Sequence, residues 1–397
     1  MLHWRSKSIG EAFKVVNGGT PKTGIDAYWD GAHQWITPAE MSGLSTPYIS
    51  SSRRTLTDEG LRVGAELVPP NSIILSTRAP IGHLVINEVP MAFNQGCKGL
   101  VPSEEIDTKY AYYFLLANVP LLESLGTGAT FKELSGGKLK EVAFHYPELS
   151  EQRRIVAILD EAFEGIATAK ANAEKNQRNA REIFESYLQR VYSTKTDHLP
   201  RGRLEALCET DRLITYGVIK LGDPVVDGVP CLRTSNVRWL EIDTTGMKRI
   251  APSLSLEYGR TILRGGEVLV NVRGTLGGVA VVPDEMAGWN VSREVAVVPV
   301  NSEFLVPEFA SFWIGSRTSQ EWLSGVKKGA AYTGINIEDL RNLPVPIPSL
   351  NDQRAIVESI LAVRDDTRRL GGIYGTKLAA FRELKTALLD RAFAGQL

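Results

Sequence analysis

The residues of this chain that could do chemistry are hydrogen-bond donors and cations in loop-forming segments rich in glycine and proline. Arginine can bind guanine through two hydrogen bonds, asparagine or glutamine can bind adenine in the same way, and lysine neutralises phosphate. The candidate DNA contacts in the first half are Thr20, Lys22, Arg53, Arg54, Arg78, Asn94, Gln95 and Lys132. Those in the second half are Lys220, Arg233, Asn236, Arg273, Asn290, Arg293, Lys327, Lys328, Tyr332 and Thr333. Any one of these residues could equally be an ordinary solvated side chain, so the hypothesis depends on how the chain arranges them.

No sequence pattern predicts catalysis. The chain lacks the phosphate loop GxxxxGK[ST], the zinc motif HExxH, the nucleophile motif GxSxG and a GxGxxG that follows a strand. Its three cysteines lie far apart and predict neither a zinc site nor a disulfide framework. A duplicated catalytic site would duplicate its base, but the histidines of one half have no counterpart in the other. We therefore expect no catalytic residue, no metal ligand and no cofactor in this chain.

Composition limits the class of protein. The 397 residues are 43% hydrophobic and 23% charged, which is typical of globular domains and argues against disorder. No run approaches the ~18 apolar residues of a membrane span, and the first residues do not resemble a signal peptide. We expect a cytoplasmic protein. The net charge of −1 gives no bulk electrostatic argument for nucleic acid.

The chain repeats itself. The phrase from Ser72 to Gly82 returns from Glu267 to Gly277, so that Arg78 pairs with Arg273 at a separation of 195 positions. Further on, the phrase Pro-x-Leu-x-[Glu/Asp]-Gln-Arg-x-Ile occurs at 147–155 and again at 348–356, now 201 positions apart. The change in separation from 195 to 201 positions indicates that one module occurs twice and that the two copies differ by loop insertions. For Arg78 and Arg273, a shared internal ion pair and a DNA contact remain equally open.

Each copy has a globular part followed by a helical part. Short apolar runs at 72–77, 82–89, 267–272 and 278–282 predict strands, and 108–118 and 307–315 predict short helices. The residues that follow, at 151–192 and 352–393, contain no proline and predict long helices. A helix over 151–192 would span roughly 63 Å at 1.5 Å per residue. This length is enough to hold two DNA-binding domains one turn of DNA apart, which is ~34–36 Å.

Both predicted helices carry a stripe with alternating spacing of four and three, which is typical of a coiled coil. The first stripe is Ile155, Leu159, Ala162, Ile166, Ala169, Ala173, Asn176, Ala180, Ile183 and Tyr187. The second is Ile356, Ile360, Val363, Thr367, Leu370, Tyr374, Lys377, Phe381, Leu384 and Leu388. Small residues in the first stripe complement large ones in the second, so we expect the two helices to pair. The alternative is that each helix packs on its own globular domain.

On these phrases the chain resembles the specificity subunit of type I restriction–modification systems. The resemblance rests on Gly19-Thr-Pro-Lys22, on Tyr28-Trp29-Asp-Gly31 and Trp35-Ile36, on the two arginine phrases and above all on the doubled helix opening. It implies an α+β fold with two similar target-recognition domains, joined by two long helices that form an antiparallel coiled coil. The second domain departs from the pattern, with Ile214-Thr-Tyr-Gly217 where the first has Gly18-Gly-Thr-Pro21.

The resemblance implies a non-catalytic subunit that reads a bipartite, asymmetric DNA site. We expect recognition domains at 1–146 and 199–347, and helical regions at 147–198 and 348–397. Two methyltransferase subunits and two restriction (motor-nuclease) subunits would be the protein partners and would supply the chemistry of S-adenosylmethionine, ATP and Mg²⁺. The doubled helix openings, with Gln152, Arg153, Gln353 and Arg354, are the predicted docking sites, because two equivalent sites suit two copies of one partner. The alternative function is a protein-interaction scaffold built on a coiled coil that binds no DNA.

Overall fold

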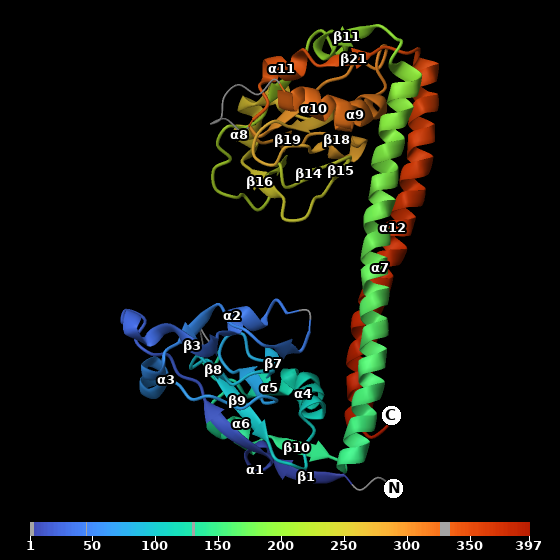
Figure 1. The fold of residues 1–397 in the computed structure, drawn as a ribbon. Helices are drawn as coiled ribbons and strands as arrows, with labels where there is room; N and C mark the ends of the chain where they lie inside the picture. The colour runs from blue at the N-terminus through green and yellow to red at the C-terminus, as the bar shows by residue number, and fades with distance from the viewer. Residues whose placement is uncertain (1–3, 45, 129–131, 326–333) are drawn as a thin grey trace. The chain divides into compact units, whose positions relative to one another are not determined.

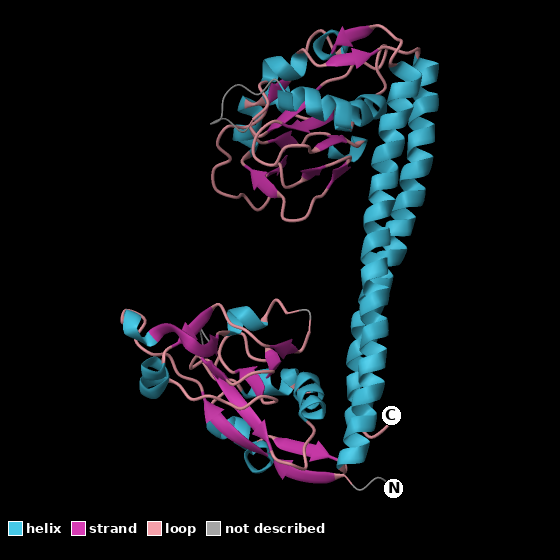
Figure 2. Ribbon diagram, viewed as in Figure 1, coloured by secondary structure: helices cyan, strands magenta, loops and turns pink. Residues whose placement is uncertain are grey.

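The computed structural model describes residues 4–44, 46–128, 132–325 and 334–397, and Figures 1 and 2 show its helices and strands. The chain divides into two compact units. The first comprises Met1–Ala173 and Thr376–Leu397, and the second comprises Glu174–Gly375. The two long helices, α7 (Leu149–Thr196) and α12 (Leu350–Phe393), each contribute one part to each unit. Each globular domain thus forms a compact body with the helix segments that belong to its own unit.

The first domain combines strands with short helices. Its strands are β1 (Arg5–Ser8), β2 (Phe13–Asn17), β3 (Trp29–Ile36), β4 (Tyr48–Ile49), β5 (Arg54–Leu56), β6 (Ile73–Ser76), β7 (Leu84–Asn87), β8 (Met91–Phe93), β9 (Cys97–Pro102) and β10 (Ala143–Tyr146). Its helices are α1 (Ile9–Ala12), η1 (Asp26–Tyr28), α2 (Pro38–Met41), α3 (Asp58–Gly64), α4 (Thr108–Ala117), α5 (Val119–Leu125) and α6 (Gly136–Glu141).

The second domain has the same composition. Its strands are β11 (Arg201–Arg203), β12 (Thr215–Tyr216), β13 (Val229–Leu232), β14 (Val237–Arg238), β15 (Glu241–Ile242), β16 (Lys248–Ile250), β17 (Val268–Asn271), β18 (Val279–Val281), β19 (Asn290–Val291), β20 (Val295–Val298) and β21 (Pro344–Pro346). Its helices are η2 (Leu204–Leu207), α8 (Pro252–Glu257), η3 (Gly259–Thr261), η4 (Asp284–Met286), α9 (Pro307–Gly315), α10 (Arg317–Gly325) and α11 (Ile337–Arg341).

Sheet topology confirms the internal repeat. The main sheet of the first domain has the order β2-β9-β6-β7-β4, and that of the second has the order β12-β20-β17-β18. A three-stranded sheet follows in each, β5-β3-β8 and β16-β13-β19, with one antiparallel and one parallel pairing in both. The strands and short helices predicted around the arginine phrases are present as β6, β7, β17, β18, α4 and α9. The predicted α+β class with two similar domains is therefore correct.

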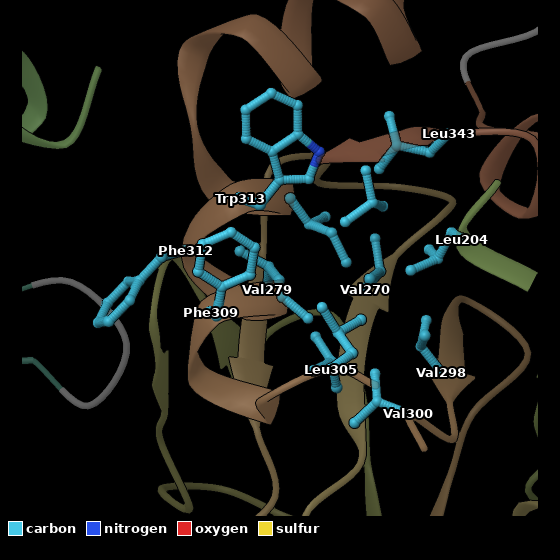
Figure 3. Packing of buried hydrophobic residues seen from close by; sticks show 14 of the residues in the cluster. Leu204, Val270, Val279, Val298, Val300, Leu305, Phe309, Phe312, Trp313 and Leu343 are labelled. Carbon is cyan, nitrogen blue, oxygen red and sulfur yellow. The ribbon is translucent and has the colours of Figure 1, made fainter. Parts of the chain in front are cut away.

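In each domain a helix covers the main sheet and closes a hydrophobic core. Figure 3 shows Phe309 and Trp313 of α9 packed over Val270, Val279 and Val298 of the sheet. Burial of such side chains stabilises a fold by about 1.5–3 kcal/mol each. All three cysteines lie free in these interiors, where burial raises the pKa of each thiol to about 12. Among the described residues, no helix has a run of apolar residues long enough to cross a bilayer.

The two long helices pack together in antiparallel fashion, as predicted. In the first unit, Ile155 and Leu159 of α7 share a core with Leu389 and Ala392 of α12. In the second unit, Phe184 and Leu188 of α7 share a core with Ile356, Val357 and Ile360 of α12. Each pairing also includes side chains of the adjacent domain, so both packing arrangements that the sequence left open occur at once.

The predicted stripe is wrong in its later positions. Ile183 is 53% exposed, whereas the neighbouring Phe184 is 4% exposed, and Leu370 and Leu384 also face solvent. An α-helix has 3.6 residues per turn, so a strict 3.5-residue stripe drifts by about 20° per heptad around a straight helix. Packing against the domain then selects Phe184 over Ile183.

One glutamine in each half ties the start of a long helix to its domain. Gln152 Oε1 accepts from the Asp107 N–H at 2.8 Å, and its Nε2 donates to the carbonyls of Glu105 and Pro147, both at 2.9 Å. Gln353 repeats these contacts, because it accepts from Val306 N–H at 2.8 Å and donates to the carbonyls of Phe304 and Pro348.

Both glutamines are fully buried, so their predicted contact with a partner is wrong. The reason is that each side chain satisfies buried backbone groups at the junction of helix and domain. The neighbouring Arg153 and Arg354 are exposed.

We predict that Gln353→Leu destabilises the protein by about 2–4 kcal/mol, because the carbonyls and the N–H that Gln353 satisfies would remain buried without partners. Denaturant unfolding followed by circular dichroism measures the change. The matched control is Arg354→Leu, which alters an exposed neighbour and should stay within about 0.5 kcal/mol of wild type. A loss of less than 1 kcal/mol for Gln353→Leu would contradict the proposed tie.

Candidate nucleic-acid interface

The predicted contacts of the first domain gather at one edge of its main sheet. Strands β2 and β6 end at this edge and β9 begins there, because β9 runs antiparallel to both. The segments after Asn17 and Ser76 and the turn before Cys97 therefore meet. Backbone hydrogen bonds join them, from Gly19 N–H to Phe93 O at 2.9 Å and from Thr77 N–H to Gly96 O at 2.7 Å.

Two glycines allow this close approach. A Cβ on Gly18 would lie 1.9 Å from the carbonyl oxygen of Asn94, and a Cβ on Gly19 would lie 1.9 Å from that of Gly64. Both distances are far below van der Waals contact, so any other residue here would push the segments apart. The glycine pair thus sets the position of the Thr20–Lys22 segment.

Two tryptophans of β3 hold the Thr20–Lys22 segment through hydrogen bonds from their indole N–H groups. Trp35 Nε1 donates to Gly19 O at 2.9 Å, and Trp29 Nε1 donates to Lys22 O at 3.3 Å. Their rings pack edge to face with centroids 5.1 Å apart. The guanidinium of Arg54 lies 3.5 Å from the centroid of the Trp29 ring, a cation–π contact that positions this exposed arginine beside the segment.

Arg78 forms an internal ion pair at this edge. Its Nη2 lies 2.7 Å from Glu133 Oε2, and both side chains are nearly half exposed. Lys98 lies close by, where burial, opposed by the charge of Glu133, lowers the pKa of its ammonium. Of the two roles left open for Arg78, the ion pair is present, and the exposure of the side chain leaves it within reach of a ligand.

The second domain repeats the backbone network of this edge. Val218 N–H donates to Val291 O at 2.8 Å and Val272 N–H to Glu294 O at 2.9 Å, matching the bonds made by Gly19 and Thr77. The turn before β20 closes with a bond from Val295 N–H to Ser292 O at 3.0 Å, as the turn before β9 closes from Cys97 to Asn94 at 3.0 Å. Arg293 therefore occupies the position of Gln95, and both side chains are exposed.

Side chains at the second edge differ from those at the first. The guanidinium of Arg273 lies 5.6 Å from the ring centroid of Tyr216, where Arg78 instead meets Glu133. Lys220 is exposed two residues after Val218, which accepts a hydrogen bond from Arg293 N–H at 2.8 Å. Arg273, Arg293 and Lys220 thus lie on segments that this edge brings together.

The remaining predicted residues of the first domain belong to the same surface. Thr20 Oγ1 donates to Gln95 Oε1, and Asn94 Oδ1 accepts from Gly96 N–H at 3.1 Å. Lys132 is exposed, and its carbonyl accepts from Ala79 N–H at 3.3 Å. Lys22 and Arg53 are exposed. The first domain therefore presents all eight of its predicted contacts at the protein surface, although Thr20 and Asn94 are only partly exposed.

Two predicted contacts of the second domain are wrong. Asn236 and Asn290 are fully buried. The Nδ2 of Asn236 donates to Asp243 O at 2.8 Å, and Asn290 Oδ1 accepts from Thr261 Oγ1 at 2.8 Å. Both amides hold loops together inside the domain and cannot reach a base.

The other predicted residues of the second domain divide into two groups. Arg233 is partly buried and donates from Nη2 to Gly246 O at 2.9 Å. It follows Leu232, whose carbonyl accepts from Ser292 N–H at 2.8 Å, so it lies beside the edge with its guanidinium already bonded to a loop. Lys327, Lys328, Tyr332 and Thr333 lie outside the described residues.

Sequence reasoning did not select Lys98 or the donor roles of Trp29 and Trp35. Lys98 lies on β9, whereas the glycine- and proline-rich pattern that predicts contacts marks loops. Trp29 and Trp35 follow the glycine pair within 20 residues, and aromatic residues after such a pair are a signal that a loop needs support. These residues show that the candidate surface depends on strand side chains beneath the loops.

Comparison with known proteins identifies the family. A family model described as "Type I restriction modification DNA specificity domain" matches residues 1–177 and 234–370. The chain belongs to this family. As the resemblance of its phrases predicted, it is a specificity subunit of the type I restriction–modification class.

Relatives and solved structures agree with this assignment. The specificity subunit of the type I restriction enzyme EcoBI from Escherichia coli is 25% identical over 356 residues, which are 83% of this chain and 74% of the relative. The MjaIX specificity subunit from Methanocaldococcus jannaschii is 33% identical over 187 residues, which are 46% of this chain and 43% of that protein.

Two solved structures share the fold. One chain, from "Structural basis underlying complex assembly and conformational transition of the type I R-M system", covers the whole of both chains with a TM-score of 0.76 at 19% identity. The HsdS subunit from Thermoanaerobacter tengcongensis matches with a TM-score of 0.56 at 18% identity, over 99% of this chain and 97% of that one.

We predict that Trp35→Phe loosens the Thr20–Lys22 segment without unfolding the domain. The change keeps an aromatic ring but removes the hydrogen bond to Gly19 O, which costs about 1 kcal/mol. Amide exchange in a peptide covering residues 18–25 should become five- to tenfold faster. The matched control is Trp239→Phe, which removes an equivalent bond to Gly315 O in the second domain and should leave this peptide unchanged.

Proposed function

We propose that this specificity subunit reads a bipartite, asymmetric DNA site with one half-site for each recognition domain. The observation that carries the proposal is the duplicated sheet edge, where one backbone network presents different exposed side chains. Gln95 suits adenine and Arg293 suits guanine, since each can make two hydrogen bonds to the major-groove edge of that base. Two domains of the same construction with different contacts would read different half-sites.

The cations around each edge would fix the domain on the DNA backbone. Lys22, Arg53 and Lys132 are exposed in the first domain, and Lys220 is exposed in the second. Contacts of lysine and arginine with phosphate position a protein on the duplex but carry no sequence information. Selectivity in this proposal therefore belongs to the turns that hold Gln95 and Arg293.

Catalysis would belong to the partners of the subunit. We propose two methyltransferase subunits and two restriction subunits, which would bring S-adenosylmethionine, ATP and Mg²⁺ to DNA in the cytoplasm. This chain would determine which DNA sequence the complex binds and would provide the surface on which the complex assembles. Among the described residues, the exposed groups named at the sheet edges are donors and cations, apart from Glu133, which is paired with Arg78.

The docking sites proposed for the methyltransferase lie at the start of each long helix. Arg153 and Arg354 are exposed at equivalent positions, held there by the buried glutamine next to each. In the second unit, Phe304 and Ile347 are exposed beside the start of α12. Further along the helices, Ile183, Leu370 and Ile373 also expose apolar surface in that unit. Apolar side chains ringed by charge are typical of a protein interface.

We predict that exchanging the two turn residues changes one half-site at a time. In complexes assembled with the methyltransferase, Arg293→Gln should weaken selection at one base pair of one half-site by about 1–3 kcal/mol and leave the other half-site intact. Gln95→Arg should act only on the other half-site. Selection of bound duplexes from a random pool, followed by sequencing, measures both effects.

The control for this experiment is Arg178→Gln, an exposed residue of α7 that belongs to neither turn. Arg178→Gln should leave the selected sequence unchanged. Wild-type complexes that enrich no sequence would refute DNA reading and favour the protein scaffold. A change in both half-sites from one substitution would refute one domain per half-site.

We predict that methyltransferase and this chain purify in a ratio of two to one. Arg153→Glu or Arg354→Glu alone should give a one-to-one complex, because each reverses charge at one of two equivalent docks, and the double variant should give none. Native mass spectrometry measures the ratio, with Arg62→Glu as the control that keeps it. A one-to-one wild-type complex would contradict the duplicated dock.

A further inference from the structure

The first domain holds Arg78 in an ion pair that the second domain does not repeat. Arg78 and Arg273 are equivalent in the internal repeat, and each forms an isolated antiparallel bridge with a later segment of its domain. The residue across the bridge is Glu133 for Arg78 and Gly334 for Arg273. Glycine offers no carboxylate, so this ion pair belongs to the first edge alone.

The next residues along each bridging segment confirm this correspondence. Leu134 N–H donates to Thr77 O at 2.8 Å, and Ile335 N–H donates to Val272 O at 2.7 Å. The two segments therefore meet the arginine strand in the same register. The carboxylate is a difference between two otherwise matching frameworks.

Glu133 engages one edge of the guanidinium and leaves another edge available. Arg78 donates to Glu133 Oε2 from Nε at 3.2 Å and from Nη2 at 2.7 Å. A guanidinium has five N–H groups in one plane, so both hydrogens of Nη1 and one of Nη2 remain. Among the described residues, none accepts a hydrogen bond from Nη1. Adjacent N–H groups of Nη1 and Nη2 suit the O6 and N7 atoms of guanine, which arginine binds through two hydrogen bonds.

The backbone of Glu133 is fixed on both sides of the residue. Its N–H donates to Thr127 O at 2.9 Å, and its carbonyl accepts from Thr127 N–H at 3.0 Å. The carboxylate thus holds the arginine from a braced position. An arginine that is already oriented loses less side-chain freedom when it binds a base.

A second cation keeps this cluster positive. Burial lowers the pKa of the Lys98 ammonium, and the charges of Glu133 and Arg78 act on it in opposite directions. The strand register places Ala296 where the first domain has Lys98. Two cations and one ionised carboxylate leave the first edge with a net positive charge for the DNA backbone.

The ion pair lies beside the turn that carries Gln95. A Cβ on Gly96 would lie 3.5 Å from the Cβ of Arg78, so the two segments touch. Both side chains of the ion pair are nearly half exposed, and exposed pairs add little to the free energy of unfolding. Stability alone therefore does not account for Glu133.

We propose that Arg78 contacts a guanine in the half-site of the first domain and that Glu133 is the positioning residue that orients it. This inference rests on the proposed function and adds a second base contact to that of Gln95. Glu133 acts through Arg78 and makes no contact with a base.

Selection of bound duplexes from a random pool, with complexes that contain the methyltransferase, tests the proposal. The half-site of the first domain is the one that Gln95→Arg alters. Arg78→Ala should lower the preference for guanine at one base pair of this half-site by about tenfold. Glu133→Ala should lower it at the same base pair by about threefold or more, and the other half-site should not change. Glu133→Gln keeps an oxygen that accepts from arginine and should retain most of the preference.

A double variant separates positioning from direct reading. Arg78→Ala combined with Glu133→Ala should select the same sequences as Arg78→Ala alone, because Glu133 acts only through the arginine. The matched control is Glu185→Ala, which removes the carboxylate of another exposed pair, with Arg181 at 2.8 Å on α7. This control should leave the selected sequence unchanged.

Three results would overturn the inference while wild-type complexes still enrich a bipartite sequence. They are an unchanged or stronger preference in Glu133→Ala, a base other than guanine at the pair that Arg78→Ala alters, and an effect of Glu133→Ala at a different base pair or in the absence of Arg78. The last result would make Glu133 a direct reader. Wild-type complexes that enrich no sequence would instead refute the proposed function, and this inference with it.

Discussion

Each recognition domain is tied to a long helix by a single amide side chain that satisfies backbone groups from two segments at once. Gln152 and Gln353 each accept one N–H and donate to two carbonyls at the junction of helix and domain. Because the side chain is fully buried, the groups that it pairs have no access to water and depend on it. The exposed arginine that follows each glutamine is therefore presented in the same way in both units. The buried framework of the junction is thus duplicated together with the exposed residue that follows it.

The sheet edges follow the same rule: the buried backbone hydrogen bonds are shared by both domains, and the exposed side chains differ. Backbone bonds at Gly19 and Val218, and at Thr77 and Val272, are equivalent in the two domains. Gly18 in the first domain and Gly217 in the second both lie too close to a carbonyl to tolerate a Cβ. The side chains that reach solvent from this framework, Gln95 and Arg293, differ in chemistry. A specificity subunit of this construction can change its contacts by substitution at the turn without altering the backbone that presents it.

The sequence predicts the parts of the fold that repeat and misses those that depend on packing. Phrases around Arg78 and Arg273 located β6 and β17 because a buried strand ending in a turn has a strong local signature. The helical stripe failed at Ile183, since the choice between Ile183 and Phe184 depends on the domain that packs against α7. Asn236 and Asn290 were selected by residue type, yet an amide in a loop serves equally well to hold that loop from inside. Residue type predicts what a side chain can bind, whereas burial decides whether it binds its own chain.

Charge has consequences for how such a subunit could read DNA. With 45 basic and 46 acidic residues, the chain gains little of the nonspecific attraction that dominates most protein–DNA binding. At the first edge, Arg78 is paired with Glu133 and Arg54 is stacked on Trp29, so part of the local positive charge is already engaged. Under the proposed function, the few exposed cations of this chain position each domain on the phosphates, and the partner subunits supply the remaining phosphate contacts. A reader that holds DNA weakly on its own is selective only within its complex, which couples recognition of the site to assembly.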